Sequence, residues 1–198
     1  MACWHGQEKP EVNALTVCQY IDIKGRSAVK PYFRSGMHPR ADHLIATLDL
    51  RPHPEGGFYR EVYRSAERVV PADARGNRAA LTTIYFLLPA GSHSRWHVVA
   101  SDEVWHLYEG DGLELLELDA LGANLTRHRL AAVGDGAGAP VHTVPAGNWQ
   151  AARPLGAYAL VGCTVAPGFE FADFQMLVER PDLAATVRTA WPDVASLL

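Results

Sequence analysis

The sequence contains little cysteine and no excess of positive charge. Its three cysteines, Cys3, Cys18 and Cys163, lack the close C-x-x-C spacing of zinc sites and redox motifs. We therefore expect reduced thiols and place Cys163 in the core. The formal net charge is −4, so the chain lacks the global positive field that drives non-specific binding to nucleic acid. Nucleic-acid polymers are thus excluded as expected partners.

Long hydrophobic runs are also missing. The longest, such as Leu81–Ala90, span about ten residues, half of what a membrane helix needs. The first thirty residues contain no basic segment followed by an apolar one, which a secretory signal would require. The composition, 48% hydrophobic and 20% charged, is close to the globular average. We therefore expect a soluble cytoplasmic protein that makes no membrane contact.

Lysine is absent beyond residue 30, whereas 14 of the 15 arginines follow that point. Residues 1–40 also lack sustained helical or strand periodicity and are interrupted by proline and glycine. This pattern predicts an N-terminal extension over residues 1–40, either a flexible tail or a swapped arm, followed by a single domain over residues 41–198.

The predicted domain consists mainly of short strands. Asp42 is the expected N-cap of a helix over His43–Leu50, and Pro181 begins a second helix that continues through Asp182–Ala190. Between them, apolar or alternating segments separated by turn residues predict nine strands, which favours an antiparallel sandwich or barrel. These segments are Phe58–Tyr63, Leu81–Leu88, Trp96–Val99, Val104–Tyr108, Leu113–Leu118, Thr126–Leu130, Val141–Val144, Ala157–Val165 and Phe169–Phe174.

Two spaced motifs lie in the strand region. The first runs from Gly91 through His97, Val99 and Glu103 to Gly110, and the second is Pro145-Ala146-Gly147 followed by Gln150. They resemble the cupin motifs G-x5-H-x-H-x3/4-E-x6-G and P-x-G-x2-H, with every spacer intact. The resemblance implies an all-β jelly roll, a double-stranded β-helix with a short helix at each end. Alternate residues share a face, so His97, Val99 and Glu103 should point into the barrel, with Gln150 opposite them.

Two departures from these motifs bear on metal binding. Metal-binding cupins resembling this chain use three histidines and one glutamate, but here Val99 and Gln150 replace the second and third histidines. His97, Glu103 and Gln150 would be the ligands if a divalent transition metal bound, and an amide oxygen is a weak ligand for such an ion. His93 is an alternative ligand if its strand is regular. We therefore expect no resident metal cofactor.

Longer strings narrow the resemblance to the cupin-5 family, small RmlC-like cupins of largely unassigned function. It covers roughly Leu44 to Glu179 and implies a homodimer with a small-molecule pocket, but no particular reaction. The strings are HPEGGFYRE from His53, SRWH from Ser94, SDEVWH from Ser101, VPAGNWQAA from Val144 and VGCTVAPGF from Val161.

The pocket residues suggest proton-transfer chemistry. His97 and Glu103 could form an acid/base pair, with Tyr59 or Tyr108 as the acid on the opposite face of the substrate. The segment Glu55–Glu61 also resembles the R-G-x-F-x-E string of carbohydrate epimerases, but Gly56 stands where those enzymes have arginine. This difference weakens a diphosphate-binding interpretation.

Arginines and tryptophans near the motifs are candidate ligand contacts. Arg60 and Arg95, together with Arg64 and Arg153, are possible replacements for the missing arginine, although most arginines on a sandwich are solvated. Trp105 and Trp149 could stack on a planar ligand, and Gln150 could form hydrogen bonds to the edge of an amide or a nucleobase. Simple core packing is the alternative for the tryptophans. We expect outward-facing or structural roles for four other residues, His106, Tyr108, His128 and His142.

Two main functions follow from these residues. The first is a metal-independent isomerase or epimerase acting on a sugar-like or carbonyl compound, with His97, Glu103 and Tyr59 as catalytic residues. The second is a non-catalytic cupin that binds a purine-like or other small ligand through Gln150, Glu103 and the tryptophans. A mononuclear metal-dependent cupin enzyme is the third and weaker hypothesis.

Overall fold

The computed structural model describes residues 19–21, 27–29, 36–136 and 138–198. The chain divides into two compact units, Met1–Ser35 and Gly36–Leu198. In the first unit, β1 (Gln19–Ile21) pairs antiparallel with β2 (Ser27–Val29). The predictions for Cys3 and Cys18 lie outside the described residues. Everything below concerns the second unit.

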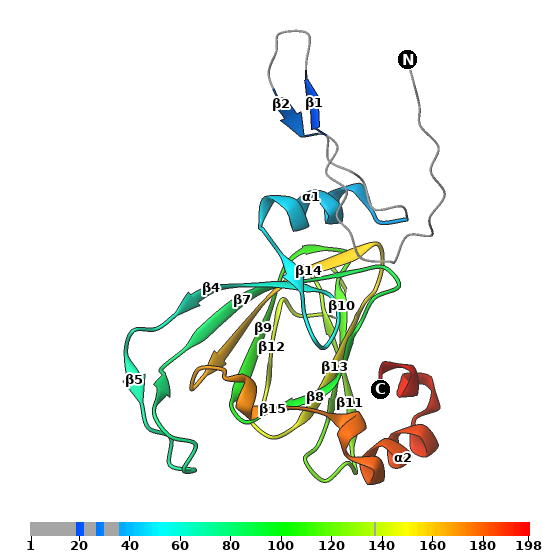
Figure 1. The fold of residues 1–198 in the computed structure, drawn as a ribbon. Helices are drawn as coiled ribbons and strands as arrows, with labels where there is room; N and C mark the ends of the chain where they lie inside the picture. Colours follow the sequence, from blue (N-terminus) through cyan, green and yellow to red (C-terminus); the bar gives the residue numbers. More distant parts are fainter. Residues whose placement is uncertain (1–18, 22–26, 30–35, 137) are drawn as a thin grey trace, which may run out of the picture. The chain divides into compact units, whose positions relative to one another are not determined.

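Two antiparallel sheets form the body of this unit (Figure 1). A separate hairpin pairs β5 (Arg68–Val69) with β6 (Arg78–Ala79). The six-stranded sheet has the spatial order β12 (Val141–Val144), β9 (Asp102–Gly110), β14 (Tyr158–Ala166), β7 (Thr82–Pro89), β4 (Phe58–Arg64), β3 (Arg51–Pro52). The five-stranded sheet has the order β11 (Leu125–Leu130), β10 (Leu113–Leu118), β13 (Trp149–Pro154), β8 (Ser94–Val99), β15 (Phe174–Met176). The predicted all-β jelly roll is confirmed.

The buried apolar residues form three cores, of which the third packs Leu87 and Leu160 of the six-stranded sheet against α1 (Pro39–Thr47). Inward-facing residues such as Phe86, Trp105 and Leu115 pack between the sheets. On the other face of the five-stranded sheet, Trp149 and its neighbours pack under α2 (Pro181–Ala190) and the 3-10 helix η3 (Pro192–Leu197). Because the second and third cores cover outer faces of the two sheets, a buried site can lie only between the sheets.

The first helix begins earlier than predicted. Instead of His43–Leu50 with Asp42 as N-cap, α1 spans Pro39–Thr47, and His38 caps it by accepting the Arg40 N–H. Pro39 fits the first helical turn because its missing N–H would have no partner there. Asp42 lies in that first turn, and Ala41, Leu44 and Ile45 are buried. None of the helices in the described ranges is long and apolar enough to cross a membrane.

The last predicted strand is wrong in part. Of Phe169–Phe174, residues Phe171–Asp173 form the 3-10 helix η1, and only Phe174 belongs to a strand, β15. The Asp173 N–H donates to the Glu170 carbonyl, which closes a turn where a strand was expected. A further 3-10 helix, η2 (Leu177–Glu179), leads into α2. The turn at Pro145–Gly147 separates β12 from β13, as the second motif predicts.

Candidate functional site

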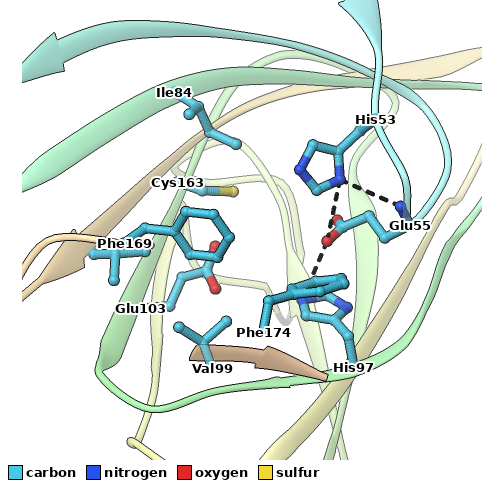
Figure 2. A pocket seen from close by; sticks show the side chains of 10 residues that line it. His53, Glu55, Ile84, His97, Val99, Glu103, Cys163, Phe169 and Phe174 are labelled. Carbon is cyan, nitrogen blue, oxygen red and sulfur yellow. Dashed lines mark hydrogen bonds and ion pairs between the residues drawn. The ribbon is translucent and has the colours of Figure 1, made fainter. Parts of the chain in front are cut away.

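A small cavity lies between the two sheets, and Figure 2 shows its wall. The free space is about 40 Å³, enough for a few atoms. His97 and Val99 reach it from β8 and Glu103 from β9, so their predicted convergence is confirmed. The other lining residues are His53, Glu55, Ile84, Cys163, Val165, Phe169 and Phe174.

The His97 imidazole is held as a neutral base. Its Nδ1 lies 2.7 Å from the Arg95 carbonyl oxygen, which can only accept, so Nδ1 carries the proton and Nε2 keeps a lone pair. The ring is 1% exposed and stacks on Phe174 with centroids 5.3 Å apart. Burial lowers the pKa of His97, although the nearby Glu103 partly opposes this. His97 can therefore accept a proton at Nε2 near neutral pH.

Gln150 fixes the position of His97 and Glu103. The Trp105 indole Nε1–H, a donor only, bonds the Gln150 Oε1 at 3.0 Å and thereby sets the orientation of the amide. The Gln150 Nε2 then lies 3.1 Å from the His97 Nε2 and 2.5 Å from the Glu103 Oε2, and donates to both. As predicted, Gln150 lies opposite His97 in the strand register. Gln150 therefore hydrogen-bonds both cavity residues and fixes their positions relative to each other.

Glu55 joins this group from the loop between β3 and β4. Its Oε2 lies 3.3 Å from the His97 Nε2 and 3.4 Å from the His53 Nδ1, and Ser94 Oγ donates to its Oε1 at 2.8 Å. Burial raises the pKa of Glu55 to about 8, against the Ser94 hydrogen bond and the Arg95 charge. Glu55 is therefore largely a neutral acid at pH 7.

The loop that carries Glu55 needs glycine. Gly56 has φ +117°, and a Cβ there would overlap the carbonyl oxygen of His93. The Arg95 N–H also donates to the Glu55 carbonyl at 2.9 Å, which ties the loop to the start of β8. These contacts place the Glu55 carboxyl against His97.

Burial shifts the pKa values of the other titratable groups of the cavity towards their neutral forms. Burial, together with the neighbouring His97, lowers the pKa of His53 to about 3. Burial raises the pKa of Glu103, and Glu55 adds to this, whereas His97 and Gln150 oppose it. The pKa of the Cys163 thiol is raised by burial and by Glu103, so the residue stays a thiol. Cys163 is free and buried, as predicted.

Protonation of Glu55 gives a testable effect on stability. Because its folded pKa of about 8 exceeds the ordinary value of 4.5, the stabilisation is complete below pH 4.5 and is lost as the pH rises towards 8. We expect the unfolding free energy of Glu55→Gln, minus that of wild type, to grow across this interval. Denaturant unfolding at several pH values measures it. A constant difference would show that Glu55 is ionised in the folded protein.

The residues at the cupin metal position do not suit a metal ion. Val99 offers no ligand atom, and Gln150 directs its amide nitrogen towards His97 and Glu103 because Trp105 occupies its oxygen. An amide N–H is not a metal ligand. His93, the alternative ligand, lies outside the cavity, beside a second hollow that Arg153 also lines. These residues therefore do not form a metal site at the cupin position.

The tryptophans chosen as stacking residues lie in the cores. Trp105 is fully buried between the sheets, with its ring edge-on to Phe86 at a centroid distance of 6.0 Å. Trp149 points to the opposite face of its sheet, into the core under α2. Neither ring lines the cavity. The aromatic rings that do line it belong to Phe169, Phe174, His53 and His97.

Tyr59, Arg60 and Arg95 also lie outside the cavity wall. Tyr59 packs behind His53, edge-on, with ring centroids 4.4 Å apart. Arg60 is half-buried on β4 and does not line the cavity. Arg95 donates to the Pro54 carbonyl at 2.5 Å and so supports the Glu55 loop from outside. No lysine or arginine of the described residues lines the cavity.

His53 and Glu55 are the functional candidates that sequence reasoning missed. Both belong to the string HPEGGFYRE, which the resemblance singles out, but they precede the strand and follow no periodicity. The sequence feature that points to them is the adjacent Gly56-Gly57 pair, and both of these glycines have positive φ in the structure. Such a turn can bring a neighbouring side chain back onto the sheet.

Comparisons with known proteins agree with this architecture. The family described as "Cupin superfamily (DUF985)", Cupin_5, matches residues 42–177. A solved structure of a hypothetical protein from Leishmania major is 31% identical, with a TM-score of 0.68, over 79% of this chain and 95% of that one. A protein from Shewanella oneidensis is also 31% identical, with a TM-score of 0.67, over 79% of this chain and 93% of that one. No curated protein matches. The chain belongs to the Cupin_5 family of the cupin superfamily.

Proposed function

We propose that the protein is a metal-independent proton-transfer enzyme, an isomerase or epimerase of a small carbonyl or sugar-like compound. The observation that carries this proposal is the Glu55–His97 pair. A carboxyl kept protonated by burial lies 3.3 Å from an imidazole nitrogen kept unprotonated by its tautomer. Neighbouring acid and base groups whose environments favour opposite roles are typical of acid–base catalysis.

The reaction begins with removal of a proton from the carbon beside the substrate carbonyl. The His97 Nε2 gives up the hydrogen bond from the Gln150 amide and takes this proton. The C–H electron pair forms the new C=C bond, and the Glu55 carboxyl proton moves to the carbonyl oxygen. In the resulting enediol, the hydroxyl on the deprotonated carbon gives its proton to the Glu55 carboxylate. The His97 imidazolium returns its proton to the former carbonyl carbon, so the carbonyl group moves to the neighbouring carbon and the isomerisation is complete. Glu103 stabilises the transient imidazolium, because a nearby carboxyl that can ionise favours the charged imidazole.

The cavity limits the substrate class. About 40 Å³ admits only the reacting fragment, so the rest of a larger substrate must lie at the entrance. Apolar side chains form most of the wall, and no arginine or lysine of the described residues lines it. Both features favour a small uncharged carbonyl group over a nucleotide diphosphate.

Solvent deuterium exchange tests this proposal across a whole class of candidate substrates at once. The purified protein is incubated in D₂O with a panel of small aldoses, ketoses and keto acids, and proton NMR follows loss of the signal beside the carbonyl. We expect stereospecific exchange with at least one compound, and a reduced rate in Glu55→Gln. If a compound raises the melting temperature but no panel member exchanges, the protein is a binding cupin and the enzymatic proposal fails.

A further inference from the structure

A second cluster of titratable side chains lies apart from the cavity. The Nε2 atoms of His128 and His142 lie 3.1 and 3.0 Å from the same carboxylate oxygen, the Oε2 of Glu117. The two imidazole rings stack with centroids 3.5 Å apart. No other three His, Cys, Asp or Glu side chains of the described residues bring their ligand atoms within 4.8 Å of one another.

The fold builds this cluster from three strands of two sheets. Glu117 lies on β10 opposite Gln150, His128 on β11 opposite Leu115, and His142 on β12 opposite Trp105. Since Leu115 and Trp105 face the core between the sheets, all three cluster residues face inward. The β11 and β12 strands are edges of their sheets, so the cluster bridges the seam between them.

Gln150 separates the cluster from the cavity. One row of paired residues runs from His97 on β8 through Gln150 on β13 to Glu117 on β10. The side chain of Gln150 is 1% exposed and bonded to His97, Glu103 and Trp105. The two groups of side chains can therefore be varied independently.

The spacing of the ligand atoms suits a transition-metal ion, and both Nε2 lone pairs can point at one ion once the stacked imidazole rings turn apart. Tetrahedral Zn²⁺ with bonds of about 2.0–2.1 Å places its ligand atoms about 3.3 Å apart. The observed N···O separations of 3.0 and 3.1 Å are close to this value. Two imidazoles and one carboxylate also match a ligand set that zinc sites use when they keep one position open.

The surroundings supply a supporting contact and access to solvent. The Asn148 Nδ2 donates to the other carboxylate oxygen of Glu117 at 2.7 Å and thereby orients the Oε2 towards the imidazoles. Such outer hydrogen bonds orient metal ligands in known sites. The side chains of Glu117, His128 and His142 are 15, 23 and 26% exposed, so an ion can enter and water can complete its coordination.

We propose that Glu117, His128 and His142 bind a divalent transition-metal ion, Zn²⁺ in the first instance, and that this ion joins β11 to β12 across the sheet seam. The site is distinct from the cupin metal position, which lies at the His97 cavity. It is also independent of the proposed proton-transfer function.

Zinc titration of the full chain tests the proposal. The protein is treated with chelator, transferred to chelator-free buffer and titrated with ZnCl₂ in a calorimeter. We expect one saturating event in wild type that disappears in His142→Gln and His128→Gln. Asn148→Ala should weaken it roughly 10- to 100-fold, as for other residues that orient metal ligands. Zn²⁺ should also raise the melting temperature of wild type but not of His142→Gln.

Two control variants locate the event. His106→Gln is the matched control, since His106 lies on β9 opposite Val141 and faces away from the cluster, stacked on Tyr108. His97→Gln tests whether zinc binds in the cavity at His97 instead. Circular dichroism shows whether each variant is folded. Glu117→Gln keeps the size of the side chain but removes the carboxylate ligand, so it should also lose zinc binding. Absence of binding in wild type, or an event lost in His97→Gln and retained in folded His142→Gln, would overturn the proposal.

Discussion

His97→Asn is expected to lower kcat for deuterium exchange by about 10²- to 10⁴-fold, the usual contribution of a positioned general base. The asparagine amide fills part of the space that the imidazole ring occupied, but it has no basic nitrogen. KM should change much less, because the apolar wall from Ile84, Phe169 and Phe174 stays in place. Steady-state kinetics on the substrate found in the exchange screen measures both constants.

The matched control is His106→Asn, because His106 faces away from the cavity and should leave kcat unchanged. A structural effect of His97→Asn is recognised by its circular dichroism spectrum and its melting temperature. If the folded variant keeps wild-type kcat, His97 is not the base, and Glu103 becomes the remaining candidate at this position.

The pH profile of kcat/KM gives a second measure of the same pair. Activity should rise as His97 loses its proton, at a pH below the ordinary histidine value, because burial lowers its pKa. It should fall again as Glu55 ionises near pH 8. In Glu55→Gln the alkaline decline should be absent, since an amide has no proton to lose in this range. A decline that persists in this variant would assign it to another group.

The sequence was sufficient to predict the fold and three of the ten residues that line the cavity. Motif spacing predicted that His97, Val99 and Glu103 point into the barrel, with Gln150 opposite them, because strand alternation fixes the side on which each residue lies. The structure has this arrangement. The implied homodimer stays a prediction.

The rest depended on contacts that periodicity does not encode. Glu55 reaches His97 only because the Gly56-Gly57 turn folds the loop before β4 onto β8. Trp105 and Gln150 were expected to meet a ligand, but the indole N–H and the amide oxygen bond each other. His128 and His142 were expected to be structural, yet residues 11 and 25 positions beyond Glu117 converge on its carboxylate. Such convergence follows from strand pairing between distant segments, which no local motif shows.

Asp173→Ala is expected to destabilise the fold by about 3–5 kcal/mol, the typical result of removing one partner of a buried ion pair. The Arg78 guanidinium donates to the Asp173 carboxylate, and their side chains are only 4 and 9% exposed. Arg75 lies 3.4 Å from the same carboxylate oxygen. Alanine would leave the buried Arg78 charge without its carboxylate partner, which accounts for most of the expected loss.

The exposed pair Arg180–Asp182 provides the matched control. Its side chains are 46 and 64% exposed, so Asp182→Ala should cost much less than Asp173→Ala. The double variant Arg78→Met with Asp173→Ala should recover part of the loss, because it removes the unpaired charge together with its partner. Denaturant unfolding measures all three. Because Asp173 precedes Phe174, which stacks on His97, Asp173→Ala should also loosen the cavity wall. Equal losses in Asp173→Ala and Asp182→Ala would show that the buried pair contributes no more than a surface one.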